Sequence, residues 1–158
     1  MRHFPPEPAP ALAVRRAQTA LFLELSRIQA VAQRRTAELT AAQGIEGITP
    51  AQANVLMVVF QARAPITARA LARTLGFAEP TVSRLVKALE AAGWVARTPD
   101  PSDGRARLIA ATAQARAALP QFIAVSNALL DEAFAGLDAA AVEGLFAWVQ
   151  RLVANLDG

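Results

Sequence analysis

The sequence predicts a mainly α-helical fold: a winged helix-turn-helix with long N- and C-terminal helices and a two-stranded β-wing. Three observations support this prediction. Apolar residues recur at helical spacing through most of the chain. Residues 66–112 read as helix, turn, helix and β-hairpin in one continuous block. Two strand-like runs, WVART and LIAAT, flank the turn segment DPSDGRAR.

The composition suits one domain, or two small lobes that share a core. With 158 residues, 54% of them hydrophobic, the chain has ample apolar material to bury. It has no cysteine and one histidine, His3, so we expect neither a metal site, nor a cofactor, nor histidine-based catalysis. No apolar run is long enough to span a bilayer or resembles a signal peptide. These features predict a soluble cytoplasmic protein.

Positive charge is concentrated in the middle of the chain. Residues 63–107 contain eight Arg or Lys against four acidic residues, a net charge of +4, although the whole chain carries only +3. Residues 117–158 carry −4. A basic middle beside an acidic end indicates that the middle faces a polyanion while the end has another role.

The N-terminal part is predicted to be an arm followed by a long helix. Residues 1–10 hold four of the ten prolines and should form an extended, flexible arm. In residues 11–47, apolar side chains such as Leu21, Leu25 and Ile28 recur at helical spacing until two glycines end the pattern. We assign this segment to dimerisation, because one small lobe cannot readily bury its apolar stripe.

Residues 48–112 are predicted to form the winged lobe. Thr49 caps a helix with Pro50 at its first position, and that helix is apolar nearly all round, so we expect it to be buried. Thr67 is placed to cap the first helix of the helix-turn-helix, and Gly76 ends that helix.

The second helix of the motif, expected from Pro80 onward, has two distinct faces. One face is apolar and should pack on the core of the lobe, through Val82, Leu85, Val86 and Leu89. The other carries small and basic side chains, Thr81, Ser83, Arg84 and Lys87. Small side chains permit close approach to a groove, Arg pairs bidentately with guanine, and Lys and hydroxyls bond phosphate or base edges. An ordinary solvated face would look the same in isolation.

Arginines on the neighbouring elements favour DNA contact over a solvated face. Arg69 and Arg73 on the preceding helix would support contacts to the DNA backbone. Arg105 and Arg107 lie at the hairpin, where a wing arginine can enter the minor groove. Asp103 is placed to hold Arg105 by a charge-assisted hydrogen bond.

A calcium loop is an alternative for the hairpin tip. Asp100, Ser102 and Asp103 before Gly104 loosely match the opening of such a loop. The spacing is wrong, however, the later ligands are missing, and arginines intervene. Turn chemistry is the better interpretation.

Residues 113–158 are predicted to form two further dimerisation helices. The helical pattern runs past Pro120 to Phe134, Gly136 marks a stop, and Asp138 is a plausible N-cap. The last helix follows three-four spacing throughout, with Val142, Leu145, Phe146, Val149, Leu152, Val153 and Leu156. A homodimer of interleaved terminal helices is favoured over simple completion of a monomer core, because helix-turn-helix proteins usually bind two-fold sites.

Catalysis is not predicted, since the chain lacks a phosphate-cradling glycine loop, a nucleophile-base set and suitably spaced carboxylates. Two other classes stay open. The winged lobe could bind a protein partner, or it could be an architectural DNA binder without a ligand switch.

The chain resembles the MarR family of bacterial transcription regulators, and its SlyA-like branch most closely. The resemblance is carried by TPAQANVL, LARTLGFAEPTVSRLVKALEAAGWVAR and the wing DPSDGRAR. It implies an obligate homodimer on a palindromic double-stranded DNA operator, a repressor released by a small, often aromatic, ligand. It also implies major-groove roles for the polar face of the second helix and a wing pair of Asp103 and Arg105, assisted by Arg107.

The chain departs from the family pattern at several positions. Ala78 stands where a Ser or Thr often caps the second helix, which forgoes about 1 kcal/mol of capping, and Glu79 offsets part of that loss through the helix dipole. Ala111 replaces the usual Leu before Thr112, a minor packing change. The absence of cysteine excludes the peroxide-sensing thiol of one branch. The ligand and its pocket residues are not identified by the sequence.

Overall fold

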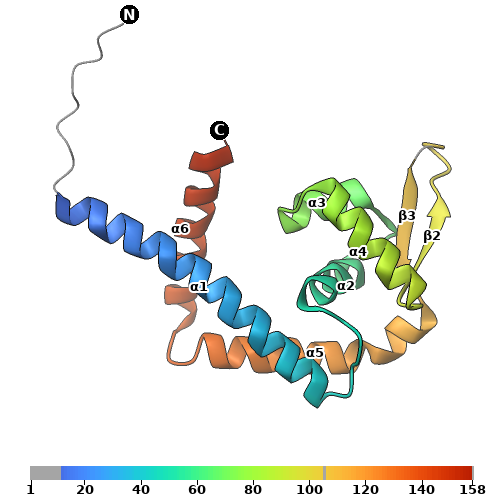
Figure 1. Cartoon of the computed structure of the whole chain (residues 1–158), viewed down its shortest axis with the longest axis horizontal. Helices are drawn as coiled ribbons and strands as arrows, with labels where there is room; N and C mark the ends of the chain where they lie inside the picture. The colour runs from blue at the N-terminus through green and yellow to red at the C-terminus, as the bar shows by residue number, and fades with distance from the viewer. Residues whose placement is uncertain (1–11, 105, 158) are drawn as a thin grey trace, which may run out of the picture.

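The computed structural model describes residues 12–104 and 106–157, and the predicted arm at residues 1–10 lies outside them. The helices are α1 (Leu12–Ala42), α2 (Pro50–Gln61), α3 (Ala68–Leu75), α4 (Glu79–Ala91), α5 (Ala113–Ala133) and α6 (Ala139–Asp157). The strands are β1 (Ile66–Thr67), β2 (Val95–Pro99) and β3 (Arg107–Ala111). Figure 1 shows α2, α3, α4 and the strands gathered into a winged lobe, with α1, α5 and α6 forming a helical stalk.

The starts of three helices follow from local side-chain chemistry. Thr49 and Gln52 form a reciprocal capping box at α2, in which the Thr49 backbone N–H donates to Gln52 Oε1 at 2.8 Å. The hydroxyl of Thr67 caps α3. At α6, Asp138 Oδ1 accepts from the backbone N–H of Ala141 at 2.8 Å. The three N-caps predicted from the sequence are therefore confirmed.

The strands form one antiparallel sheet in the order β1-β3-β2. Strands β2 and β3 pair along their whole lengths and make the predicted wing. Strand β1 was not predicted; it places Ile66 opposite Ile109 on the other edge of β3. The prediction of two strands is thus corrected to three, because a strand of two residues is too short to show an alternating pattern.

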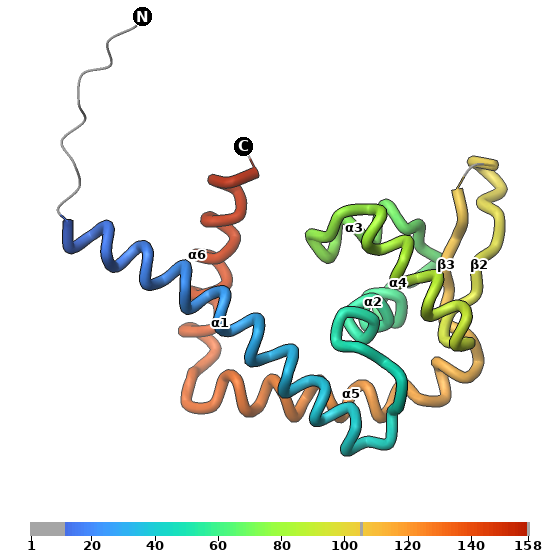
Figure 2. The backbone as a smooth tube through the Cα atoms, in the orientation of Figure 1, coloured from blue at the N-terminus to red at the C-terminus, as the bar shows by residue number. Residues whose placement is uncertain are grey.

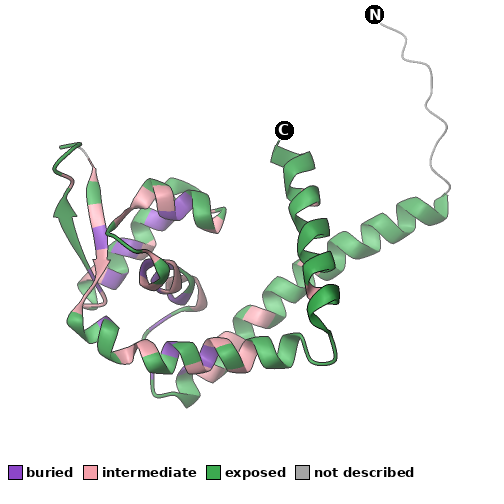
Figure 3. Cartoon of the chain, turned by 180° about the vertical axis from the view of Figure 1, so that it is seen from behind, coloured by how far each residue is buried: buried purple, intermediate pink, exposed green. Residues whose placement is uncertain are grey.

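The apolar core lies inside the winged lobe. Its fully buried side chains come from α2, α3, α4 and the sheet, and the largest are Leu56, Leu71, Leu89, Ile109, Val55, Val82, Val86 and Val95. Phe122 of α5 reaches the same core, with its ring centroid 5.7 Å from those of Phe60 and Trp94. Figure 3 shows buried residues in the lobe and along the middle of α5. Aromatic packing therefore attaches the stalk to the lobe.

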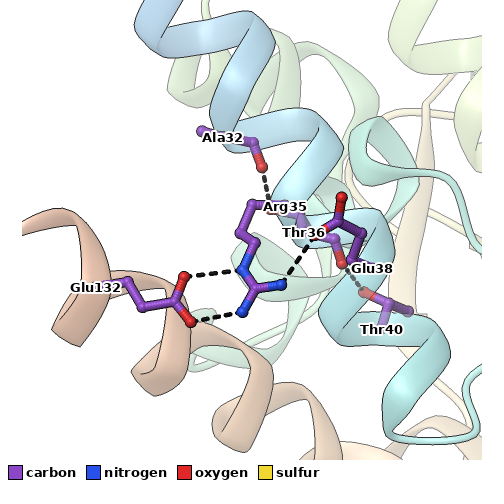
Figure 4. Close-up of polar contacts among 6 residues, drawn as sticks. All are labelled: Ala32, Arg35, Thr36, Glu38, Thr40 and Glu132. Carbon is purple, nitrogen blue, oxygen red and sulfur yellow. Dashed lines mark hydrogen bonds and ion pairs between the residues drawn. The ribbon is translucent and has the colours of Figure 1, made fainter.

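An ion-pair cluster ties α1 to α5 (Figure 4). Arg35 donates to both carboxylate oxygens of Glu132, at 2.8 and 2.7 Å, and to Glu38 at 2.9 Å. The hydrogen bond to Glu132, more than that to Glu38, raises the pKa of Arg35, and the same bond lowers the pKa of Glu132. The Arg35 and Glu132 side chains stay 41% and 49% exposed, so solvent screens the attraction.

Helix α6 stands apart from the winged lobe, as the tube in Figure 2 shows. It contains no buried residue, and Phe146 and Leu156 are 62% and 72% exposed. The first half of α1 is similarly bare, with Leu23 66% exposed. Within the part of the chain that the structure describes, no helix has the length and apolar character needed to cross a membrane. Helix α6 and the first half of α1 therefore carry apolar faces that the described residues leave uncovered.

We expect Glu132→Gln to destabilise the protein at neutral pH, because Arg35 loses its bidentate partner. The pKa of Glu132 lies below its ordinary value of 4.5 in the folded chain. A lowered carboxylate pKa adds stability that is present above the ordinary value and lost as the pH falls through the folded value. The difference in urea midpoint between parent and variant should be constant well above pH 4.5, shrink as the pH falls below 4.5, and vanish below the lowered pKa of folded Glu132.

Glu46→Gln is the matched control for this measurement. Glu46 is an exposed carboxylate that makes no ion pair with any described residue, so its variant should follow the parent at each pH. A destabilisation by Glu132→Gln that persisted in acid would show that the ion pair is not its cause.

Candidate nucleic-acid interface

Helix α4 is held in place by its apolar face. Val82, Val86 and Leu89 are buried on one stripe, and Leu85 is half-buried beside them. This spacing of four and three places the stripe on one side of the helix. The packing face predicted from the sequence is confirmed, and the opposite face is left at the surface.

The turn between α3 and α4 sets the start of α4. Gly76 closes α3 in the left-handed conformation, with φ 66°, which glycine adopts without steric cost. Helix α4 begins at Glu79, one residue before the predicted Pro80. Its N-cap, Ala78, makes no side-chain hydrogen bond, as the sequence implied. The carboxylate of Glu79 lies at the positive end of the helix dipole, where negative charge is favourable.

Most side chains assigned to the interface by sequence lie at the surface. Those exposed are Arg69, Arg73, Ser83, Arg84, Lys87, Asp103 and Arg107, whereas Thr81 is half-buried. Arg105 lies outside the described residues, so its expected pairing with Asp103 is untested. The described side chains form a polar surface that α3, α4 and the wing share.

An open cleft of about 440 Å³ lies between α3, α4 and the wing. Its polar lining consists of Thr67, Arg69, Glu79, Ser83, Arg97, Asp100, Asp103 and Arg107. The cleft therefore brings together four residues expected from the sequence, Arg69, Ser83, Asp103 and Arg107. Arg73, Arg84 and Lys87 are exposed on α3 and α4 but do not line it.

Asp100 organises the tip of the wing. Its Oδ1 accepts hydrogen bonds from the Ser102 hydroxyl at 2.6 Å and the Ser102 backbone N–H at 2.8 Å. These bonds, with one from the backbone of Asp103, lower the pKa of Asp100. Such local bonds are those of an Asx turn, as the turn interpretation required. In residues 12–104 and 106–157, no three His, Cys, Asp or Glu side chains cluster in a way that could hold a metal ion.

The sequence did not single out Arg97, which lines the cleft, or Glu90, which pairs with it. Arg97 of β2 donates through Nε to Glu90 Oε2 at 2.8 Å, and its Nη2 forms an ion pair with the same oxygen. This hydrogen bond lowers the pKa of Glu90 and raises that of Arg97. The only sequence signal was an acidic residue late in α4 and a basic one seven positions later, which many sequences contain by chance.

A second hollow, of about 480 Å³, lies between α1 and α6. Its lining residues are Arg15, Gln18, Thr19, Leu21, Phe22 and Leu152. Arg15 donates to Gln18 at 3.2 Å. The wall formed by α1 thus combines the polar side chains of Arg15, Gln18 and Thr19 with the exposed apolar side chains of Leu21 and Phe22.

Helix α4 packs through its apolar face beside the β2–β3 hairpin, which carries Arg97 and Arg107. This is the arrangement of winged-helix proteins that bind nucleic acids. The fold of this chain is that of the MarR family of transcriptional regulators, and residues 46–106 match the model of that family. Among curated proteins, none matches the chain.

Many solved structures share the fold, those of CouR, MarR and AbfR among them. CouR from Rhodococcus jostii RHA1, bound to p-coumaroyl-CoA, is 26% identical with a TM-score of 0.73, over 84% of this chain and 90% of CouR. Wild-type MarR from E. coli, in its apo form, is 26% identical with a TM-score of 0.62, over 84% and 95%. Reduced AbfR bound to DNA is 20% identical with a TM-score of 0.77, over 92% and 98%. At that lower identity, the likeness to AbfR concerns the fold alone.

We expect Ala78→Ser to raise the free energy of unfolding by about 1 kcal/mol, because it gives α4 the side-chain cap that it lacks. The backbone of Ala78 already has the extended conformation of an N-cap, with φ −63° and ψ 138°. Urea unfolding of both proteins measures the gain. Ala88→Ser, at an exposed position inside α4, should instead cost about 0.5 kcal/mol. Equal effects of the two substitutions would refute the capping argument.

Proposed function

We propose that this chain is a sequence-specific regulator of transcription that binds double-stranded DNA as a homodimer on a palindromic operator. The observation that carries the proposal is helix α4, whose inner face is buried while Ser83, Arg84 and Lys87 stay exposed. The adjacent cleft adds Arg69 and Arg107. A helix anchored in this way enters the major groove while the hairpin reaches the neighbouring minor groove.

The proposal assigns the polar residues of the lobe to three groups. The major-groove side chains are Thr81, Ser83, Arg84 and Lys87, with Arg84 pairing to guanine. The wing residues are Asp103, Arg105 and Arg107, of which Arg105 lies outside the described residues. Arg69 and Arg73 contact phosphates. The net charge of +4 over residues 63–107 supports this arrangement.

The homodimer is inferred from the uncovered faces of α1 and α6. Exposed apolar side chains on α6 include Leu145, Phe146, Val149, Val153 and Leu156. Those on α1 include Leu21, Phe22, Leu23 and Ile28. A second copy offers the same faces, so a two-fold pairing covers them on both chains. That symmetry presents two α4 helices and matches a palindromic DNA site.

We further propose that the protein is a repressor and that a small aromatic ligand releases it from DNA. The support is the resemblance in sequence and the CouR structure of the same fold, which holds p-coumaroyl-CoA. The SlyA-like branch is proposed on the wing segment DPSDGRAR and the preceding helices. A ligand between stalk and lobe would act by changing the spacing of the two α4 helices.

We expect Arg84→Ala to relax the preference for one base pair in each half-site by about 1–3 kcal/mol. Arg107→Ala should weaken all duplexes alike and reduce the slope of log K against log salt by about one. Selection of duplexes from a random pool, followed by titrations at several salt concentrations, measures both effects. The control is Arg34→Ala, an exposed arginine of the stalk.

The same titrations separate the alternatives. Parent-like binding by both the Arg84 and Arg107 variants would overturn the residue assignment. If the parent bound every duplex equally, it would be an architectural binder, and if it bound none, the lobe would be a protein-interaction module.

Val149→Glu is expected to dissociate the homodimer, because it places an unpaired charge in the middle of the apolar face of α6. The dissociation constant measured by sedimentation should rise at least about 100-fold. Arg151→Glu changes charge on the opposite side of the same helix and serves as the control. A parent chain that sediments as a monomer at micromolar concentration would contradict the homodimer.

A further inference from the structure

We propose that Glu90 and Arg97 are positioning residues: their ion pair fixes the angle between the wing and helix α4, so that both can hold one DNA duplex. This inference rests on the proposed DNA-binding function and deepens it. The two side chains join the last turns of α4 to the middle of β2, through the Nε–Oε2 hydrogen bond of 2.8 Å and the ion pair.

The wing has little apolar support of its own. Val95, at the base of β2, is buried, but the other four residues of the strand are exposed. Arg97 lies opposite Ile109, the only buried residue of β3. Beyond this point toward the tip, no described residue of either strand is buried. The contact of Arg97 with Glu90 therefore occurs where the apolar anchorage of the wing ends.

The negative charge of Glu90 cannot by itself favour binding to DNA. Arg97 lines the cleft together with Arg69 and Arg107. Arg107 is close enough to Glu90 to contribute to the lowering of its pKa. Next to a polyanion, a carboxylate at this place would oppose binding on charge alone. In this proposal, the Glu90 carboxylate favours DNA binding indirectly, because it holds the guanidinium of Arg97 and, through Arg97, strand β2.

Glu90→Gln distinguishes loss of charge from loss of positioning, because the two change the affinity for DNA in opposite directions. On charge alone, removal of the carboxylate strengthens binding to DNA. If the pair positions the wing, the variant weakens binding to the duplex selected by the parent by at least about threefold, the size expected for one exposed ion pair. Glu79→Gln is the matched control: it lines the same cleft, pairs with no described residue, and should bind at least as tightly as the parent.

Arg97→Gln and the double variant test whether the two residues act through each other. Positioning predicts that Glu90→Gln and Arg97→Gln each lose affinity, and that the double variant loses less than the two single losses combined. If Arg97 instead contacted phosphate directly, Arg97→Gln would weaken binding while Glu90→Gln strengthened it, and the proposal would fail. Both side chains are partly exposed, at 36% and 35%, so the variants should fold.

The distance between α4 and the wing, measured in the absence of DNA, tests the positioning role independently of DNA binding. The chain has no cysteine, so Ala88→Cys on α4 and Thr98→Cys, at an exposed position of β2 in the wing, can carry a unique pair of spin labels. With labelled chain diluted in unlabelled chain, the distance distribution should widen about twofold on Glu90→Gln and not on Glu79→Gln. An unchanged width would overturn the positioning role. A parent that bound no duplex would overturn the proposed function alone.

Discussion

The burial of one face of α4 is the interaction on which the rest of the winged lobe depends. Val82, Val86 and Leu89 close the core from one side, while α2, α3 and Ile109 of the sheet close it from the others. Rotation of α4 about its axis would expose these side chains, so the packing fixes which residues face outward. One constraint therefore determines both the stability of the lobe and the orientation of its polar surface.

Features set by nearby residues could be predicted from the sequence. The caps at Thr49, Thr67 and Asp138 depend on bonds to backbone groups three positions away, and the end of α3 depends on the conformational freedom of Gly76. The inner face of α4 follows from helical periodicity alone. For the same reason, the outer face could be assigned before the structure was known, although Thr81 is less exposed than expected.

Features set by distant residues could not be predicted. Arg35 and Glu132 are 97 positions apart, and nothing local marks them as partners. Strand β1 exists only because β3 lies beside it. Glu90 and Arg97 are only seven positions apart, but they meet because the chain folds back after α4, so their pairing too depends on the tertiary fold. A charge on a surface helix has many possible partners, and only the tertiary fold selects one.

The bare apolar face of α6 has a consequence for the lifetime of the chain. A helix of 19 residues with no buried side chain gains little from folding alone, so an isolated chain would open and close it readily. In the proposed dimer, the second copy supplies the missing cover, and stability then rises with concentration. Because proteolysis of an opened segment follows the population of the open form, cleavage within α6 should slow as the concentration of the chain rises.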